Sequence, residues 1–282
     1  MKKAKRLSKK IITLIVCGAV ILAILTAVLG LEIAFALAEK IECWTPDYEK
    51  INIRPVLEKQ TLTDEDYSVL YEQTGLTKFG VDRLLKYGTS GKNRILSIQT
   101  DYFGNYEVEN DKFGPFLCTD HIDRTITHAF LENGDILVTS STHFSGWRIG
   151  HAGLVTNSYN YEVLQSGALG ELSDIGYVSE FTDRVNFMIL SPKVEQEIKD
   201  KVVSYALGNL VGKSYFAPAG VLTSKNKANK TQCAHLVWYA YKQFGIDLDC
   251  NGGLIVTPRD LANSPYIEVV QVFGFDPEKL WK

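Results

Sequence analysis

The feature that most restricts the fold is an apolar stretch near the start of the chain. Residues Ile11 to Leu31 carry no charged side chain. An α-helix needs roughly 20 consecutive apolar residues to cross the hydrocarbon core of a bilayer, and this stretch meets that requirement. The positive residues before it are Lys2, Lys3, Lys5, Arg6, Lys9 and Lys10. Because positive flanks stay in the cytoplasm, residues 1–38 predict a cytoplasmic basic tail and a single-pass membrane anchor, with the rest of the chain outside.

A cleavable signal peptide is the alternative interpretation of the same segment. Ala34-Phe35-Ala36 and Ala36-Leu37-Ala38 offer small residues at the spacing that signal peptidases accept, and cleavage would give a secreted protein. The apolar run is longer than the usual core of a signal peptide, which favours the uncleaved anchor. Cys17 is not predicted to be acylated, because Val16 stands where a small residue is expected.

The rest of the chain is predicted to form one globular domain of ordinary core size. The 282 residues are 45% hydrophobic and 22% charged. Without the six N-terminal positive charges the formal net charge falls from −3 to −9, which argues against nucleic acid as a partner. The cysteines beyond the anchor do not form a disulfide scaffold, although one disulfide among Cys43, Cys118 and Cys250 is left open.

Three segments are predicted beyond the anchor. Residues 39–60 are a linker, and residues 61–130 are an N-terminal lobe of helices and loops. Thr63 and Thr77 each predict the N-cap of a short helix. Ile95-Leu96-Ser97-Ile98 predicts a strand, and the residues after it are rich in Gly, Asn and Asp, which indicates loops.

Residues 131–282 are predicted to form the catalytic domain. Short apolar segments separated by turns indicate an antiparallel sheet, with strands at 134–138, 150–155, 161–166, 185–190 and 267–272. Ser191 and Pro192 are predicted to open a helix, because proline is favoured at the first helical position. The predicted fold class is therefore α+β.

Cys233 begins a segment with helical spacing of apolar residues. Leu236, Val237 and Ala240 follow it by three, four and seven positions, so the sulfur is predicted on the buried face. Thr231 is the predicted N-cap, which puts Cys233 in the first turn. Free backbone N–H groups and the helix dipole favour a thiolate there, and a thiolate is the nucleophilic form of cysteine.

A cysteine on an apolar helix face is usually only a small core residue, so the hypothesis needs a base. His151, which lies among small residues in a predicted strand, is the candidate. His235 is nearer in sequence, but two positions along a helix are about 200° apart round its axis. We therefore predict His235 to be a surface or edge residue.

A metal site is the competing interpretation of the histidines. His121, His128, His143 and His151 occur in one region, but no metal-binding spacing such as HExxH or CxxC joins them. Solvated or capping roles are the simpler expectation for single histidines in loops. The sequence therefore predicts neither a metal nor another cofactor.

Six short segments, in this order, resemble the YiiX-like hydrolases. They are Gly134-Asp-Ile-Leu, His151-Ala-Gly-Leu-Val, Val163-Leu-Gln-Ser, Gly212-Lys-Ser-Tyr, Cys233-Ala-His-Leu-Val-Trp and Thr257-Pro-Arg-Asp-Leu. This family consists of circularly permuted, papain-like cysteine hydrolases of the NlpC superfamily, related to the lecithin:retinol acyltransferase-like group. The resemblance extends from Glu132 to Val270, and it implies an antiparallel sheet packed on the helix that carries the nucleophile.

The resemblance also implies roles for individual residues. Cys233 would be the nucleophile, His151 the general base, and Gln165 the third residue that orients the imidazole, where the family usually has Glu. Tyr215 matches a tyrosine near the site in relatives, in a substrate-binding or oxyanion role. Glu162 is the alternative third residue, if the strand register differs from the one expected. For the imidazole to reach the cysteine helix, His151 and Gln165 should lie on the helix-covered face of the sheet.

The implied chemistry is acyl transfer through a thioester. The first expectation for the substrate is an amide bond in peptidoglycan stem peptides, which an outward-facing domain on a membrane anchor can reach. A lipid-directed amidase, esterase or acyltransferase is the second. A catalytically silent module that binds the cell envelope is the third.

Overall fold

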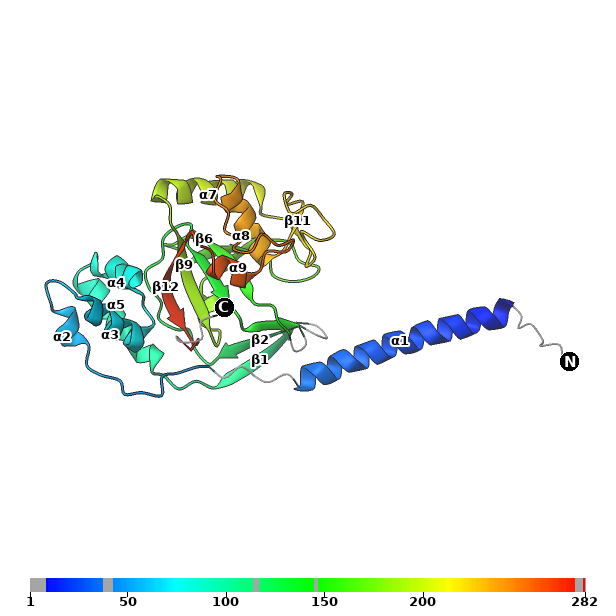
Figure 1. Ribbon diagram of the computed structural model, residues 1–282, viewed down its shortest axis with the longest axis horizontal. Coiled ribbons are helices and arrows are strands. Elements are labelled where there is room, and N and C mark those ends of the chain that lie inside the picture. The colour runs from blue at the N-terminus through cyan, green and yellow to red at the C-terminus, as the bar shows by residue number, and fades with distance from the viewer. Residues whose placement is uncertain (1–8, 38–42, 114–116, 145–146, 277–280, 282) are drawn as a thin grey trace.

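The computed structural model describes residues 9–37, 43–113, 117–144, 147–276 and 281. Helix α1 (Lys9–Leu37) contains a segment long and apolar enough to cross a membrane, and it extends away from the globular part (Figure 1). A single-pass anchor and a signal sequence both meet this description. The basic tail before residue 9, residue 38 at the end of the predicted anchor, and the start of the predicted linker at residues 39–42 lie outside the described residues.

A six-stranded sheet forms the centre of the globular part. Its strand order is β12-β9-β3-β6-β7-β8, and each neighbouring pair is antiparallel. The strands are β3 (Ile136–Thr139), β6 (His151–Asn157), β7 (Glu162–Gln165), β8 (Asp174–Tyr177), β9 (Phe187–Pro192) and β12 (Ile267–Phe273). The fold is thus α+β with antiparallel sheets, as predicted.

The remaining elements surround this sheet. The helices are α2 (Arg54–Leu57), α3 (Asp64–Thr74), α4 (Lys78–Leu85), α5 (Thr89–Tyr102), α6 (Ser179–Thr182), α7 (Gln196–Asn209), α8 (Cys233–Lys242) and α9 (Pro258–Ala262). A second antiparallel sheet contains β1 (Val108–Phe113), β2 (Leu117–Ile122), β4 (Thr142–Phe144) and β5 (Trp147–Arg148). Strands β10 (Ser214–Tyr215) and β11 (Lys230–Thr231) form a short parallel pair.

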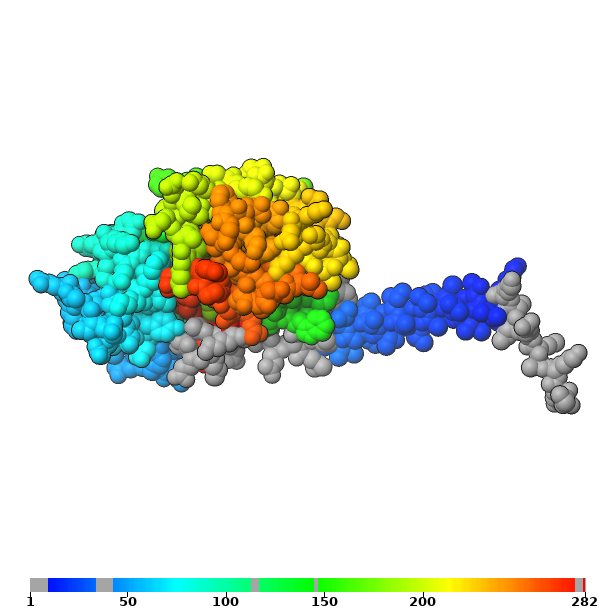
Figure 2. Space-filling view, turned by 45° about the horizontal axis from the view of Figure 1, so that its top comes forward, coloured from blue at the N-terminus to red at the C-terminus, as the bar shows by residue number. Residues whose placement is uncertain are grey.

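The six-stranded sheet is buried on both faces, because side chains alternate along each strand. One face packs with α7 and α8 in a core cluster that contains Ile136, Val138, Ala152, Leu154, Leu164 and Leu190. The other face packs with the N-terminal helices in a second cluster that contains Leu137, Val155, Val163, Phe187 and Ile189. In Figures 1 and 2, α3–α5 and α7–α8 accordingly lie on different sides of the globular part.

Helix α4 lies directly against the edge strand β12. A Cβ atom on Gly80 would be 2.1 Å from the carbonyl oxygen of Val270, so only glycine allows this approach. Thr77, the predicted cap of α4, accepts a hydrogen bond from the Gly80 N–H and donates one to the carbonyl of Val269. Thr63 caps α3 in the same way, within a capping box. The N-terminal helices and the C-terminal strand therefore form one packed unit.

The predicted strand Ile95–Ile98 is wrong, because these residues lie inside α5. Ile95, Ile98 and Tyr102 are separated by three and four positions and bury one face of the helix. A short apolar run does not distinguish a strand from a buried helix turn. The region predicted as loops after this segment also contains two strands, β1 and β2. They were not predicted because the sequence of β1 is mostly polar and shows no strand pattern.

The helix predicted after Ser191 and Pro192 is present as α7, but its predicted start is wrong. Both residues belong to β9, and α7 begins later, at Gln196. The hydroxyl of Ser191 accepts hydrogen bonds from Arg83 (2.9 Å) and Lys199 (2.7 Å), which hold it in the strand. Pro192 is the last residue of β9, a position where the missing N–H costs little.

Candidate active site

Cys233 is the first residue of α8, and only 7% of its surface is exposed. The predicted N-cap, Thr231, is wrong: the cap is Gln232, whose side-chain oxygen accepts a hydrogen bond from the N–H of Ala234 at 2.9 Å. The same oxygen lies 3.3 Å from the sulfur of Cys233 and accepts its S–H. Gln232 therefore both starts the helix and holds the thiol.

His235 is completely buried, so its predicted place at the surface is wrong. Its ring nitrogens lie 2.9 Å from the hydroxyl of Thr231 and 2.8 Å from the carbonyl of Lys225. These contacts use Thr231 to fix the loop before α8 rather than to cap the helix. The loop that precedes α8 thus folds over the outer face of the helix, which the helical spacing of residues alone does not indicate.

Burial raises the pKa of the Cys233 thiol to about 11. Nearby backbone N–H groups of Ala152, Ala234 and Cys233 and the positive charge of Arg184 lower this pKa, but they do not offset the desolvation. The expected shift toward a thiolate is therefore the reverse of what the structure indicates. A pKa of about 11 indicates a neutral thiol near pH 7.

His151 is the first residue of β6 and is buried, with 6% of its surface exposed. Its ring stacks on Phe181, with 5.2 Å between the ring centroids. Burial, and next the positive charge of Arg184, lower the pKa of His151 to about 4, against the opposing effect of its hydrogen bond to Gln165. The imidazole is therefore neutral near pH 7, as a general base must be.

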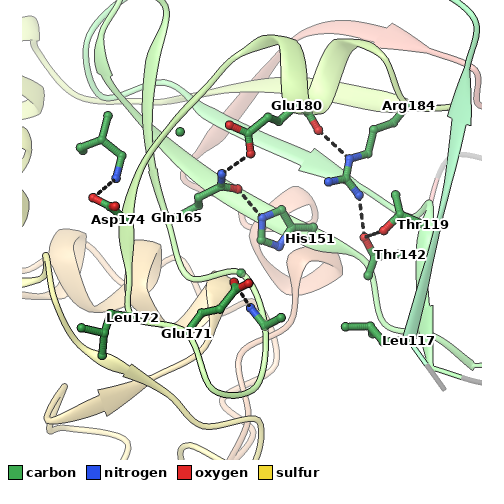
Figure 3. A pocket seen from close by; sticks show the side chains of 14 residues that line it. Leu117, Thr119, Thr142, His151, Gln165, Glu171, Leu172, Asp174, Glu180 and Arg184 are labelled. Atoms are coloured by element: carbon green, nitrogen blue, oxygen red, sulfur yellow. Dashed lines mark hydrogen bonds between the residues drawn. The ribbon is translucent and has the colours of Figure 1, made fainter. Parts of the chain in front are cut away.

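Gln165 lies directly beside His151, as Figure 3 shows. Its side-chain oxygen is 2.7 Å from Nε2 of His151, and its side-chain nitrogen donates a hydrogen bond of 2.6 Å to the carboxylate of Glu180. A carboxylate only accepts hydrogen bonds, so Glu180 fixes which end of the amide faces the imidazole. Nε2 must then carry the proton, and Nδ1 retains the lone pair that a base uses.

The imidazole and the amide lie on the face of the sheet opposite to the one expected. Gln165 pairs with Gly153 across β6 and β7, next to the buried pair Val155 and Val163. This face belongs to the core cluster of the N-terminal helices, whereas α8 covers the other face. His151 nevertheless lines the same cavity as Cys233. It is the first residue of β6, so it lies at the end of the sheet, where its ring is not shielded by the strand from the start of α8.

The two predicted reacting residues line one cavity of about 930 Å³. No hydrogen bond joins Cys233 to His151 within the described part of the chain. Tyr215, in β10, lines the same cavity, and burial raises the pKa of its phenol. Glu162 lies three positions before Gln165, so its side chain is on the other face of β7, where it accepts a hydrogen bond of 3.3 Å from Asn160.

His151 also lines a second cavity, of about 350 Å³ (Figure 3). It shares Leu117, Thr142, His151 and Gly167 with the larger cavity, so the two are contiguous. Glu180 and Arg184 line the smaller one. Neither residue was expected from the sequence, because each lies in a short polar segment before β9 with no motif or periodic pattern to mark it.

The other histidines have local polar partners. His121 lies 3.7 Å from Asp111 and 3.4 Å from Asp183, and His143 lies 3.4 Å from Asp120. In the ranges that the structure covers, no three His, Cys, Asp or Glu side chains are arranged to hold a metal ion. The disulfide left open is not formed, since Cys43, Cys118 and Cys250 are all free thiols.

Searches against protein-family models, curated proteins and solved structures found no match for this chain.

Proposed function

We propose that this protein is a membrane-anchored, extracytoplasmic cysteine hydrolase that cleaves amide bonds through a thioester intermediate. The observation that supports this proposal most directly is the hydrogen-bonded series from His151 through Gln165 to Glu180, beside a cavity that also contains Cys233 at a helix start. A neutral imidazole with a fixed tautomer and a neighbouring thiol are the components that nucleophilic acyl transfer requires.

In the proposed reaction, Nδ1 of His151 takes the proton of the Cys233 thiol as the sulfur attacks the carbonyl carbon. The negative charge that develops on the carbonyl oxygen is stabilised by the backbone N–H of Cys233 at the start of α8. His151 then gives its proton to the leaving amine, and water hydrolyses the thioester. Gln165 holds the ring through one hydrogen bond, which is weaker support for an imidazolium than a carboxylate would give.

Peptidoglycan stem peptides are the first proposed substrate. The apolar helix α1 near the N-terminus suits a domain held at a membrane surface, and stem peptides offer amide bonds there. A lipid-directed amidase, esterase or acyltransferase is the second candidate, because Ile149 and Ile255, which are 41% and 39% exposed, line the larger cavity.

The test is to incubate the full-length protein in detergent micelles with cell-wall fragments and, separately, with acyl lipids. We expect release of peptide fragments, and the loss of that release in Cys233→Ala and His151→Ala variants that remain folded. Turnover of the lipids alone would select the second candidate. A folded wild-type protein that turns over neither, and whose Cys233 does not react with activity-based probes, would instead be a silent envelope-binding module.

A further inference from the structure

Arg184 differs from the other buried cations of this protein. The described part of the chain contains three buried Lys or Arg side chains, Arg83, Lys199 and Arg184. Arg83 and Lys199 both form ion pairs with Asp135 and Glu132. Arg184 is 8% exposed and has no carboxylate within ion-pair distance among the residues that the structure describes.

The contacts of Arg184 leave part of its guanidinium group available. Nε donates to the carbonyl of Glu180 at 2.6 Å, and Nη1 donates to the hydroxyl of Thr142 at 2.8 Å. The guanidinium also lies 5.9 Å from the ring of Phe181. Nη2 has no hydrogen-bond acceptor among the described residues, and the side chain lines the smaller cavity, next to His151 (Figure 3).

A buried charge without a direct ion-pair partner is costly. The carboxylates of Asp183 and Glu180 act on Arg184 only at longer range, since neither lies within ion-pair distance of it. The carboxylate of Glu180, which lines the same cavity, is already engaged. Its oxygens accept hydrogen bonds from Gln165 at 2.6 Å and from the N–H of Tyr177 at 2.8 Å. The charge of Arg184 is thus free to meet an anion that enters the cavity.

We propose that Arg184 binds a carboxylate group of the substrate. A guanidinium presents parallel N–H donors that match the two oxygens of a carboxylate. The rim of the same cavity carries Glu171 and Asp174, both exposed, and their negative charges disfavour a dianionic phosphate. The favoured ligand is therefore a singly charged carboxylate, attached to a molecule that is neutral or positive near the rim.

This carboxylate site adds a substrate preference to the proposed function. It rests on the proposed function only in taking Cys233 as the residue whose sulfur reacts. The smaller cavity joins the larger one at His151 and Thr142, and Arg184 is close enough to Cys233 for its charge to lower the pKa of the thiol. An acyl substrate in the larger cavity would extend its carboxylate past His151 to Arg184. The enzyme would then select amides that carry a nearby carboxylate over neutral amides of the same length.

Carboxylate binding can be measured without any reaction. We expect N-acetylglycine, at about tenfold excess over its Kd, to raise the Tm of the full-length protein in micelles by about 3 °C. N-acetylglycinamide at the same ionic strength should not raise it. Arg184→Gln, which removes a buried charge rather than creating one, should fold and lose the shift, whereas Arg184→Lys should keep part of it.

A pair of thiol reagents connects this site to Cys233. N-iodoacetylglycine and N-iodoacetylglycinamide differ only in the charge of one end. Relative to 2-mercaptoethanol, Cys233 should prefer the charged reagent by about 10- to 100-fold, the value of one charge-assisted contact, and Arg184→Gln should abolish this preference.

The two measurements separate the two proposals. If N-acetylglycine gives no shift, or the same shift in Arg184→Gln, the carboxylate site is refuted while a reactive Cys233 leaves the hydrolase proposal standing. If the shift depends on Arg184 but Cys233 is inert to both reagents even near pH 11, where its thiol ionises, the carboxylate site stands and the proposed nucleophile is refuted.

Discussion

The protonation state of the resting site can be tested through the pH dependence of Cys233 alkylation. Burial raises the pKa of the thiol to about 11 and lowers that of His151 to about 4. Between these values both groups are neutral. We therefore predict that the site holds a thiol and an imidazole at rest, and that the ion pair forms only during the reaction.

The size of the effect follows from the thiol pKa. At pH 7 a group of pKa about 11 is about 0.01% ionised, whereas an ordinary thiol of pKa about 8.5 is about 3% ionised. Since the thiolate is the reacting species, the rate of alkylation by iodoacetamide should rise about tenfold per pH unit from pH 6 to 10 and level off near pH 11. At pH 7, Cys233 should react about 300-fold more slowly than an ordinary thiol.

Mass spectrometry of the labelled peptide after timed quenching would give the rate for Cys233 itself. Arg184→Gln provides a matched variant, because the positive charge of Arg184 lowers the thiol pKa. Loss of this positive charge should move the whole pH profile of the alkylation rate to higher pH. A rate that is already constant from about pH 5 upward would refute this reasoning, since it would mean that a thiolate–imidazolium pair exists before substrate binds.

Three further predictions concern the site, the stability and the topology. Gln165→Ala should lower kcat about 10- to 100-fold through loss of the hydrogen bond to His151, and Glu162→Ala should do little; a larger effect of Glu162→Ala in steady-state assays would show that the register argument fails. His128 and His151 both have a pKa lowered by burial to about 4, below the unfolded value of about 6.5. Each therefore adds stability that is complete above pH 6.5 and is lost as the pH falls toward 4, by about 3 kcal/mol each. Burial lowers the pKa of His235 as well, so urea unfolding of His128→Leu should keep part of the acid sensitivity of wild type and lose the rest; equal slopes would exclude this cause. Protease added outside protoplasts should digest the chain beyond α1, and complete protection would reverse the proposed orientation.

The parts of the site that the sequence could predict are those that depend on local periodicity. His151 and Gln165 lie on neighbouring strands of one sheet, with their side chains on the same face. This placement follows from the two-residue repeat of each strand and the short turn between them. The position of Cys233 at a helix start follows from the apolar spacing after it. Both inferences use neighbours within one element or one hairpin.

The parts that failed depend on what covers each element. Burial by distant segments raises the pKa of Cys233, although its place at a helix start alone predicts a lower one. Packing between segments also buries His235 in the interior, and it places Glu180 and Arg184 in the same cavity as His151. The helical assignment of Ile95–Ile98 depends likewise on the helices packed around it. The covering of Cys233 and His235, and the approach of Glu180 and Arg184 to His151, leave no repeat or spacing in the sequence.

The packing of α4 on β12 has a consequence for the order in which the protein can fold during synthesis. Thr77 bonds to Val269, a residue 192 positions later, and Leu76 forms a bridge with Gln271. The helices α3–α5 are made early, but this part of their apolar surface is covered only when the last strand has been made. Contacts so distant in sequence close slowly. The unfinished chain therefore exposes this apolar surface until β12 emerges, and such exposure favours aggregation.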